Sequence, residues 1–258
     1  MTALLDQAIA VFGQAAFLTF LVFLRVGAAV ALLPGFGEAM VPIRVKLALS
    51  FGLTAVIAPA VAGTLAPLAN SSAQLFLCLA TETVSGLSIG IVFRLTLVAL
   101  EIAGTIAAQS TSLSQFTGTG GEPMPAMSHL LLLAGLALAM LAGFHTRIAA
   151  AFILSYDALP PGAFPDAALF KGWGVSHIAS AFSLAFGLAA PFMLAATIYN
   201  VALGAINRAM PQLMVAFVGA PALTAGALVL LAVATPTALA VWVDILDGLL
   251  GDPFGAPR

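Results

Sequence analysis

The sequence predicts an all-α membrane protein with about six long hydrophobic helices, on the evidence of its composition and of its apolar segments. Hydrophobic residues make up 62% of the 258 residues and charged residues only 7%, whereas soluble domains carry about 25% charged residues. The mean hydropathy of the chain is +1.15. Because so few charged side chains cannot form the surface of a soluble protein of this length, the composition indicates a helical membrane protein.

Six apolar segments are each long enough to cross a membrane as a helix. A helix needs about 20 residues to cross about 30 Å of hydrocarbon, and backbone groups in lipid are satisfied only within helices or closed barrels. Asp6 stands where a signal peptide would have a lysine or arginine, and no A-x-A cleavage pattern follows the first segment, so we expect that segment to be retained as a span. The predicted segments are 8–34, 45–69, 73–108, 129–154, 175–206 and 212–243.

Two of these segments are too long for a simple crossing. Residues 73–108 and 175–206 would form straight helices of about 54 Å and about 48 Å, at about 1.5 Å per residue. A modest tilt does not fit such lengths into the bilayer. Pro191 predicts a kink in the second of them. We therefore expect these helices to bend, to project beyond the membrane or to pack within an assembly of subunits.

One short pattern could indicate an enzyme. Residues 86–90 read G-L-S-I-G, which matches the nucleophile elbow G-x-S-x-G, but that motif requires a strand before its serine. Here Ser88 lies in an apolar segment of helical length. We therefore interpret Gly86 and Gly90 as a G-x-x-x-G pair that lets another helix approach closely. With no phosphate-cradling or dinucleotide glycine motif in the sequence either, we expect no enzyme and no cofactor.

Metal, disulfide and nucleic-acid chemistry find little support in the sequence. His129, His145 and His177 are far apart and lack the spacing of metal ligands. The single cysteine, Cys78, can form neither an internal disulfide nor a thiolate metal site. A net charge of −2 gives no basic surface for phosphates. We therefore expect no bound metal and no nucleic-acid partner.

Charged residues inside the apolar segments are candidates for function. A charge at the centre of a membrane helix costs about 2.5–3.5 kcal/mol. Arg25 lies well inside the first segment, and Glu82, Arg94 and Glu101 lie inside the third. Arg94 and Glu101 share a helix face, because they are seven residues apart. They could line an ion path, but no chain of further acids or histidines continues it, so we favour interior pairs that hold helices in register within an assembly.

The connection between the third and fourth segments is the least apolar internal stretch of the chain. Residues 112–129 read S-L-S-Q-F-T-G-T-G-G-E-P-M-P-A-M-S-H, with three glycines and two prolines. Connections between helices are commonly rich in these residues. Composition alone therefore leaves open whether loop 109–128 is a simple turn or a working part.

Three stretches carry motifs whose order and spacing extend over nearly the whole chain. Residues 25–61 hold an arginine in the first span, an L-P-G-F-G-E turn and V-P-I-R-V-K, and end in Ala-Pro. Residues 145–162 hold His, then Ser-Tyr, then Pro-x-Gly, and residues 207–226 hold N-R-x-x-P-Q followed by G-x-P. These motifs resemble the R subunit of the flagellar type III export gate, the FliR family. The matching residues are Arg25, Pro34, Gly37, Pro42, Arg44, Lys46, Pro59, His145, Ser155, Tyr156, Pro160, Gly162, Asn207, Arg208, Pro211, Gln212, Gly219 and Pro221.

The resemblance implies a hetero-oligomeric helical gate in the bacterial inner (cytoplasmic) membrane, within the flagellar basal body. In that family the R subunit joins P and Q subunits, near the flagellar B and A export-apparatus membrane proteins and the MS ring. Unfolded export substrates would pass through the pore of the gate. Residues 1–174 would then be the P-subunit-like helical part, 175–250 the Q-subunit-like hairpin and 251–258 a short polar tail.

The resemblance also assigns expected roles to individual residues. In that family a loop at the position of loop 109–128 plugs the closed pore. Its glycines permit rearrangement, and its phenylalanine and methionines supply adaptable apolar fill. The candidate plug residues are Gln115, Phe116, Gly118, Gly120, Gly121, Pro123, Met124 and Met127. The candidate assembly or intramembrane polar residues are Arg25, Arg44, Lys46, Glu82, Arg94, Glu101, Asn207, Arg208, Pro211 and Gln212.

Three alternatives remain open at this point. The injectisome T subunit shares the architecture, so the chain could serve a virulence secretion gate. A stand-alone secondary transporter would place Arg94 and Glu101 near a substrate site and Pro191 at a broken helix. An intramembrane hydrolase would use Ser88 as its nucleophile. The L-P-G-F-G-E turn favours the flagellar gate.

Overall fold

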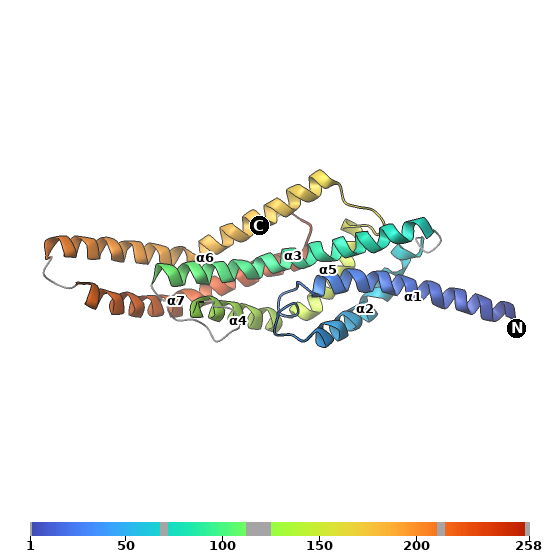
Figure 1. Ribbon diagram of the computed structural model, residues 1–258, viewed down its shortest axis with the longest axis horizontal. Helices are drawn as coiled ribbons and strands as arrows, with labels where there is room; N and C mark the ends of the chain where they lie inside the picture. Colours follow the sequence, from blue (N-terminus) through green and yellow to red (C-terminus); the bar gives the residue numbers. More distant parts are fainter. Residues whose placement is uncertain (1, 68–71, 112–124, 211–214, 256–258) are drawn as a thin grey trace. The chain divides into compact units, whose positions relative to one another are not determined.

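The computed structural model describes residues 2–67, 72–111, 125–210 and 215–255, and these ranges contain seven helices and no strand. The predicted all-α fold is therefore confirmed (Figure 1). The helices are α1 (Thr2–Val30), α2 (Ile43–Leu65), α3 (Ser72–Ser110), α4 (Ala126–Leu141), α5 (Phe144–Ala158), α6 (Ala167–Ala209) and α7 (Val215–Gly251).

Four helices are long and apolar enough to cross a membrane. The spans are Ile43–Leu65, Phe76–Ser110, Ala167–Ala209 and Pro221–Gly251. Helices α4 and α5 pass the same test only together, and they meet at an angle of 74°. The chain is thus a multi-pass membrane protein with four such helices in its described part, or five if the bent pair is one span.

The break between α4 and α5 corrects the single helix predicted over 129–154. The chain turns at Ala142 and Gly143, and Gly143 takes a φ of +81°, which L side chains rarely adopt. Thr146 Oγ1 donates a 2.8 Å hydrogen bond to the Gly143 carbonyl and helps close the turn. Apolar periodicity continues on both sides of this glycine, so hydropathy alone did not reveal the break.

The two overlong segments are indeed long helices. Helix α3 has 39 residues and α6 has 43, which corresponds to about 58 Å and about 64 Å of helix. Helix α6 begins earlier than the sequence predicted, because the Asp166 carboxylate caps it by accepting from the amides of Ala168 and Leu169. Pro191 lies inside α6. Both helices exceed the thickness of a bilayer core, which agrees with the expected projection or packing in an assembly.

The helices form two compact units, each made of separate pieces of the chain. The first unit contains Met1–Arg94, Ala142–His177 and Asp247–Arg258, and the second contains Leu95–Leu141 and Ile178–Leu246. The predicted division into 1–174, 175–250 and 251–258 describes likeness to other subunits, and it stays a prediction.

In the first unit, two glycines let α1 pack directly on α3. A Cβ atom at Gly86 would lie 2.1 Å from the carbonyl oxygen of Arg25, and one at Gly90 would lie 2.9 Å from that of Ala29. The predicted close approach at this G-x-x-x-G pair is therefore confirmed. Ser88 lies mid-helix, where its hydroxyl donates to the Val84 carbonyl. This is not the strand–turn–helix setting of a nucleophile elbow.

In the second unit, α4 and α7 pack against the C-terminal half of α3. A Cβ at Gly104 would lie 2.3 Å from Ser128 Cα, and Ser128 Oγ donates to the Glu101 carbonyl at 2.8 Å. The buried Trp242 of α7 donates from Nε1 to the Thr96 carbonyl at 2.7 Å. Helices α4 and α7 thus both contact α3.

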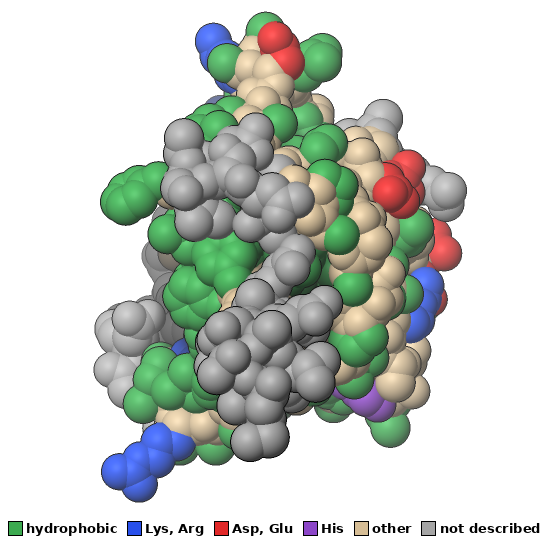
Figure 2. All heavy atoms as spheres, turned by 90° about the vertical axis from the view of Figure 1, so that its right-hand side faces the viewer, with side chains coloured by type: hydrophobic (Ala, Val, Ile, Leu, Met, Phe, Trp, Pro, Cys, Tyr) green, Lys and Arg blue, Asp and Glu red, His purple; other side chains and the backbone are tan. Residues whose placement is uncertain are grey.

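Large apolar side chains remain exposed along the helices. Figure 2 shows one face of the molecule, on which apolar side chains are widespread and the few charged ones lie toward the margin. Surfaces of this kind face lipid or other subunits. Examples are Phe51, Val56, Ile198, Val201 and Val233.

We predict that Gly86→Ala destabilises the chain by about 1–3 kcal/mol, because the added methyl group meets the backbone of α1 and cannot be accommodated by a rotamer change. Thermal unfolding in detergent and abundance in the membrane measure the effect. The matched control is Gly187→Ala in α6, where a Cβ meets no atom within 4 Å. Equal behaviour of the two variants would contradict the close-packing interpretation.

Candidate functional site

A completely buried ion pair joins α1 to α3. The Arg25 guanidinium donates from Nε to Oε2 of Glu82 and from Nη2 to Oε1, both at 2.8 Å. Both side chains are 0% exposed. This two-bond geometry is the strong form of the arginine–carboxylate pair. Gly86, one turn after Glu82, lets the backbones approach closely enough for it to form.

Helix α5 completes the surroundings of the pair. Nη1 of Arg25 donates to Ser155 Oγ at 3.1 Å, and Nη2 also donates to the carbonyl of Leu159 at 2.8 Å. The Tyr156 hydroxyl donates to Glu82 Oε2 at 3.1 Å, and its ring centroid lies 3.7 Å from Arg25 Cζ. These contacts, here called the Arg25 network, link α1, α3 and α5, together with Leu159 directly after α5.

The Arg25 network has a structural role, because it holds helices together. An arginine keeps its proton in proteins, so it does not relay protons. A buried ion pair is tolerated only when both of its side chains are also well hydrogen-bonded. Here Ser155, Tyr156 and Leu159, in α5 and directly after it, supply further hydrogen bonds. Nothing in this geometry opens a path for ions through the pair.

A second ion pair joins the L-P-G-F-G-E turn to α3. Arg94 Nη1 lies 2.5 Å from Glu38 Oε1, with the two side chains 32% and 22% exposed. The sequence had grouped Arg94 with Glu101 by helix face. In the structure Arg94 belongs to the first unit and Glu101 to the second. Glu38 was not among the residues predicted from the sequence, although it ends the L-P-G-F-G-E turn.

The turn that carries Glu38 has a tightly specified backbone. Gly35 takes a φ of +76°, and a Cβ at Gly37 would lie 2.6 Å from the Ala31 carbonyl oxygen. Phe36 stacks on Phe144 of α5, with ring centroids 6.1 Å apart. Lys46 Nζ donates to the Gly37 carbonyl at 2.9 Å. Only glycine fits at positions 35 and 37. The backbone of the turn therefore explains both glycines of the L-P-G-F-G-E motif.

The remaining predicted polar residues that the structure describes are exposed to solvent or lipid. Arg44 is exposed in the first turn of α2, and Asn207 and Arg208 are exposed at the end of α6. Pro211 and Gln212 lie outside the described residues. Their predicted role in assembly stays a prediction.

Most of the candidate plug loop also lies outside the described residues, namely Gln115, Phe116, Gly118, Gly120, Gly121, Pro123 and Met124. The two ends of the loop are described. Thr111 is buried and donates from Oγ1 to the Ala107 carbonyl at 2.7 Å. Met127 is buried with Ala107, Ala108, Phe192 and Ala227 in one apolar cluster.

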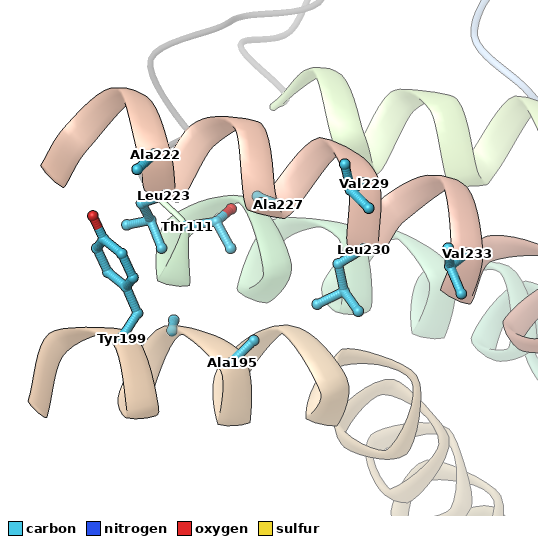
Figure 3. A pocket seen from close by; sticks show the side chains of 11 residues that line it. Thr111, Ala195, Tyr199, Ala222, Leu223, Ala227, Val229, Leu230 and Val233 are labelled. Carbon is cyan, nitrogen blue, oxygen red and sulfur yellow. The ribbon is translucent and has the colours of Figure 1, made fainter. Parts of the chain in front are cut away.

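A cavity of about 370 Å³ lies beside this cluster, between α6 and α7. In Figure 3, Tyr199 of α6 rises toward Leu223 of α7, and Thr111 at the end of α3 lies nearby. Small residues such as Ala195 and Gly226 leave the space open. The Tyr199 hydroxyl donates to the Gly219 carbonyl, which ties the two helices together near their tips.

Comparison with protein families agrees with this architecture. The family described as bacterial export proteins, family 1, matches residues 16–249. The chain belongs to this family. The match covers the Arg25 network, the L-P-G-F-G-E turn and both ends of the candidate plug loop, so each of these features lies within the part shared with the bacterial export proteins.

Individual members of the export family are similar over most of the chain. The flagellar biosynthetic protein FliR of Caulobacter vibrioides is 35% identical over 236 residues, which are 89% of this chain and 93% of that protein. FliR of Aquifex aeolicus is 28% identical over 79% of each chain. FliR of Escherichia coli is 28% identical over 77% of this chain and 76% of its own length.

We predict that Arg25→Met and Glu82→Leu, made singly, each destabilise the chain by about 3–5 kcal/mol, because each leaves an unpaired charge in the core. The double variant Arg25→Met/Glu82→Leu should lose much less than the sum of the two. Membrane abundance and thermal unfolding, arranged as a double-mutant cycle, measure the coupling. Additive losses would show that the two side chains do not act as a pair.

Proposed function

We propose that this protein is a subunit of the flagellar type III export gate in the bacterial inner membrane. The observation that carries the proposal is membership in the bacterial export family over residues 16–249. The relatives named above, which carry flagellar names, match over three quarters or more of their own length. Those flagellar names favour the flagellum over the injectisome.

The protein works in this proposal as a structural and transport component, without chemistry of its own. It joins the P and Q subunits around a pore for unfolded flagellar proteins, in the neighbourhood of the B and A membrane proteins and the MS ring. Helices of 39 and 43 residues and many exposed apolar side chains support an assembly partner rather than a lone bundle. The Arg25 network supplies the rigid core of the first unit.

Within the gate, loop 109–128 plugs the closed pore. The described ends of the loop support this role, because Thr111 and Met127 are both anchored in the second unit. The sequence between them combines glycines with Phe116 and Met124. A seal that must yield to each substrate needs firm ends and an adaptable apolar middle.

The first prediction of this proposal concerns assembly. The tagged full chain should co-purify with the P and Q subunits in a fixed ratio, and it should accumulate poorly when expressed without them, because its exposed apolar surfaces then lack partners. Purification followed by native mass measurement tests this. A stable, monodisperse protein obtained without the P and Q subunits would contradict the proposal.

The second prediction concerns the plug. Deletion of residues 115–123 should leave the assembled gate intact but raise its conductance for small ions, measured in planar bilayers. Phe116→Ser/Met124→Ser, which keeps the length of the loop, should raise it less. Unchanged conductance in the deletion variant would remove the plug while leaving the assembly proposal in place.

A further inference from the structure

The cavity between α6 and α7 offers a ligand almost nothing but hydrocarbon. Nine of the eleven residues that line it are alanine, glycine, leucine or valine, and all eleven belong to the second unit. The other two are Thr111 and Tyr199, whose hydroxyls already donate to the carbonyls of Ala107 and Gly219. A buried water needs about two to four polar partners, and apolar cavities stay dry. The lining therefore suits an apolar occupant.

The cavity has a buried floor and an open side. Ala196 and Ala227 form part of the floor and are 3% and 4% exposed. Val229 and Val233 also line the cavity, but they are 66% and 70% exposed. In Figure 3, Leu230 of α7 projects into the space between the two helices. An occupant therefore enters sideways, from the medium that surrounds the helices.

Contacts at two levels hold α6 and α7 at the spacing that leaves this space. Near the tips, the Tyr199 hydroxyl donates to the Gly219 carbonyl. Nearer the middle of the helices, Phe192 of α6 and Ala227 of α7 are buried in one apolar cluster. Gly226 adds no side chain to the gap, and a Cβ there would meet no atom within 4 Å. Because atoms that line an unfilled gap lose their dispersion contacts, an occupant that fills it stabilises this arrangement.

The dimensions of the cavity fit a single hydrocarbon chain. Its lining runs along α7 from Ala222 to Val233, which is about 17 Å of helix at 1.5 Å per residue. Half of the hydrocarbon core of a bilayer is about 15 Å, which is the depth that the acyl chains of one leaflet fill. Both helices that form the cavity are long and apolar enough to cross a membrane. The occupant is therefore available in the medium itself.

Polypeptide occupants fit the cavity poorly. A helix of the same length, with a diameter of about 10 Å, needs roughly 1,300 Å³, whereas the cavity holds about 370 Å³. An extended chain is thinner, but it brings backbone N–H and C=O groups that require hydrogen-bond partners in an apolar medium. The two hydroxyls of the lining are already engaged with carbonyls of the chain. Size excludes a helix, and polarity disfavours an extended chain.

We propose that the cavity between α6 and α7 binds one acyl chain of a membrane phospholipid, which enters past Val229 and Val233 and packs on Ala196 and Ala227. The bound chain fills the space between the two helices and holds them at their spacing. The inference requires only that α6 and α7 lie in the membrane, so it is independent of the proposed role in a flagellar gate.

The test labels the cavity from the lipid side. Cells that express the tagged full chain are fed a fatty acid with a photoactivatable diazirine on its chain, which they build into phospholipids. After illumination of the membranes, mass spectrometry locates the lipid adducts. Labelling per chain should be higher at the cavity residues Ala195 and Ala196 than at Ile198 and Val201 of the same helix. The latter are 71% and 68% exposed outside the cavity and report ordinary contact with the bilayer.

Two variants fill the cavity from opposite walls. Gly226→Leu on α7 and Ala195→Leu on α6 each place a larger apolar group where the acyl chain lies, so labelling at Ala196 should fall about tenfold. The matched control is Gly187→Leu, because a Cβ at Gly187 also meets no atom within 4 Å and this residue does not line the cavity. It should leave the labelling unchanged. Replacing a helical glycine with leucine favours the helix, so neither glycine variant should lower the abundance of the chain.

Three results would overturn the inference. Equal labelling of Ala196 and Ile198 would show ordinary contact with the bilayer instead of a bound chain. Labelling at Ala196 that persists in both filling variants would place the lipid outside the cavity. A photoreactive amino acid in place of Val229 that captures another protein chain instead of lipid would show that a neighbouring subunit fills the space. The adduct mass identifies the source of the acyl chain, and the mass of a free fatty acid alone would contradict a phospholipid.

Discussion

The first unit is organised around one requirement, that the charge of Arg25 be neutralised where no water reaches it. Glu82 supplies the opposite charge, and Ser155 Oγ and the Leu159 carbonyl accept two further hydrogen bonds. Each contact fixes a different element, so the register of α1 on α3 and the end of α5 depend on the same guanidinium. Gly86 belongs to this arrangement, because only a glycine permits the backbone approach that brings the pair together.

The turn between α1 and α2 is attached to the same core. The L-P-G-F-G-E turn begins where α1 leaves this core, and it is held by Phe36 on Phe144 and by Glu38 on Arg94. In the second unit, close contact at Gly104 and the hydrogen bond of Trp242 hold α4 and α7 on α3. Close backbone contact at glycines is common to both units, and the first unit adds the ion pairs of Arg25 and Arg94.

Composition and apolar periodicity were sufficient to predict the helical membrane fold. Gly86 and Gly90 predicted that another helix approaches α3 closely, but the sequence did not indicate that this helix is α1. The partners of the charged residues could not be predicted, because Arg25 and Glu82 are 57 positions apart and Glu38 and Arg94 are 56 apart. Only tertiary structure makes such residues neighbours. The break at Gly143 was missed because hydropathy is continuous across it. The loop assignment rested on resemblance alone, and so did the division into P-like and Q-like parts.

The Arg25 network has a consequence for how the protein is made. The ribosome delivers Arg25 long before Glu82, and at about 5–20 residues per second the 57 intervening positions take roughly 3–11 s. Tyr156 and Ser155 come later still. During that interval the positive charge of Arg25 in α1 has no counter-charge, so its transfer into the hydrocarbon core of the bilayer is unfavourable. Its integration into the membrane is therefore tied to the synthesis of α3 and α5, so the order of translation, as well as the final contacts, shapes the route to the folded chain.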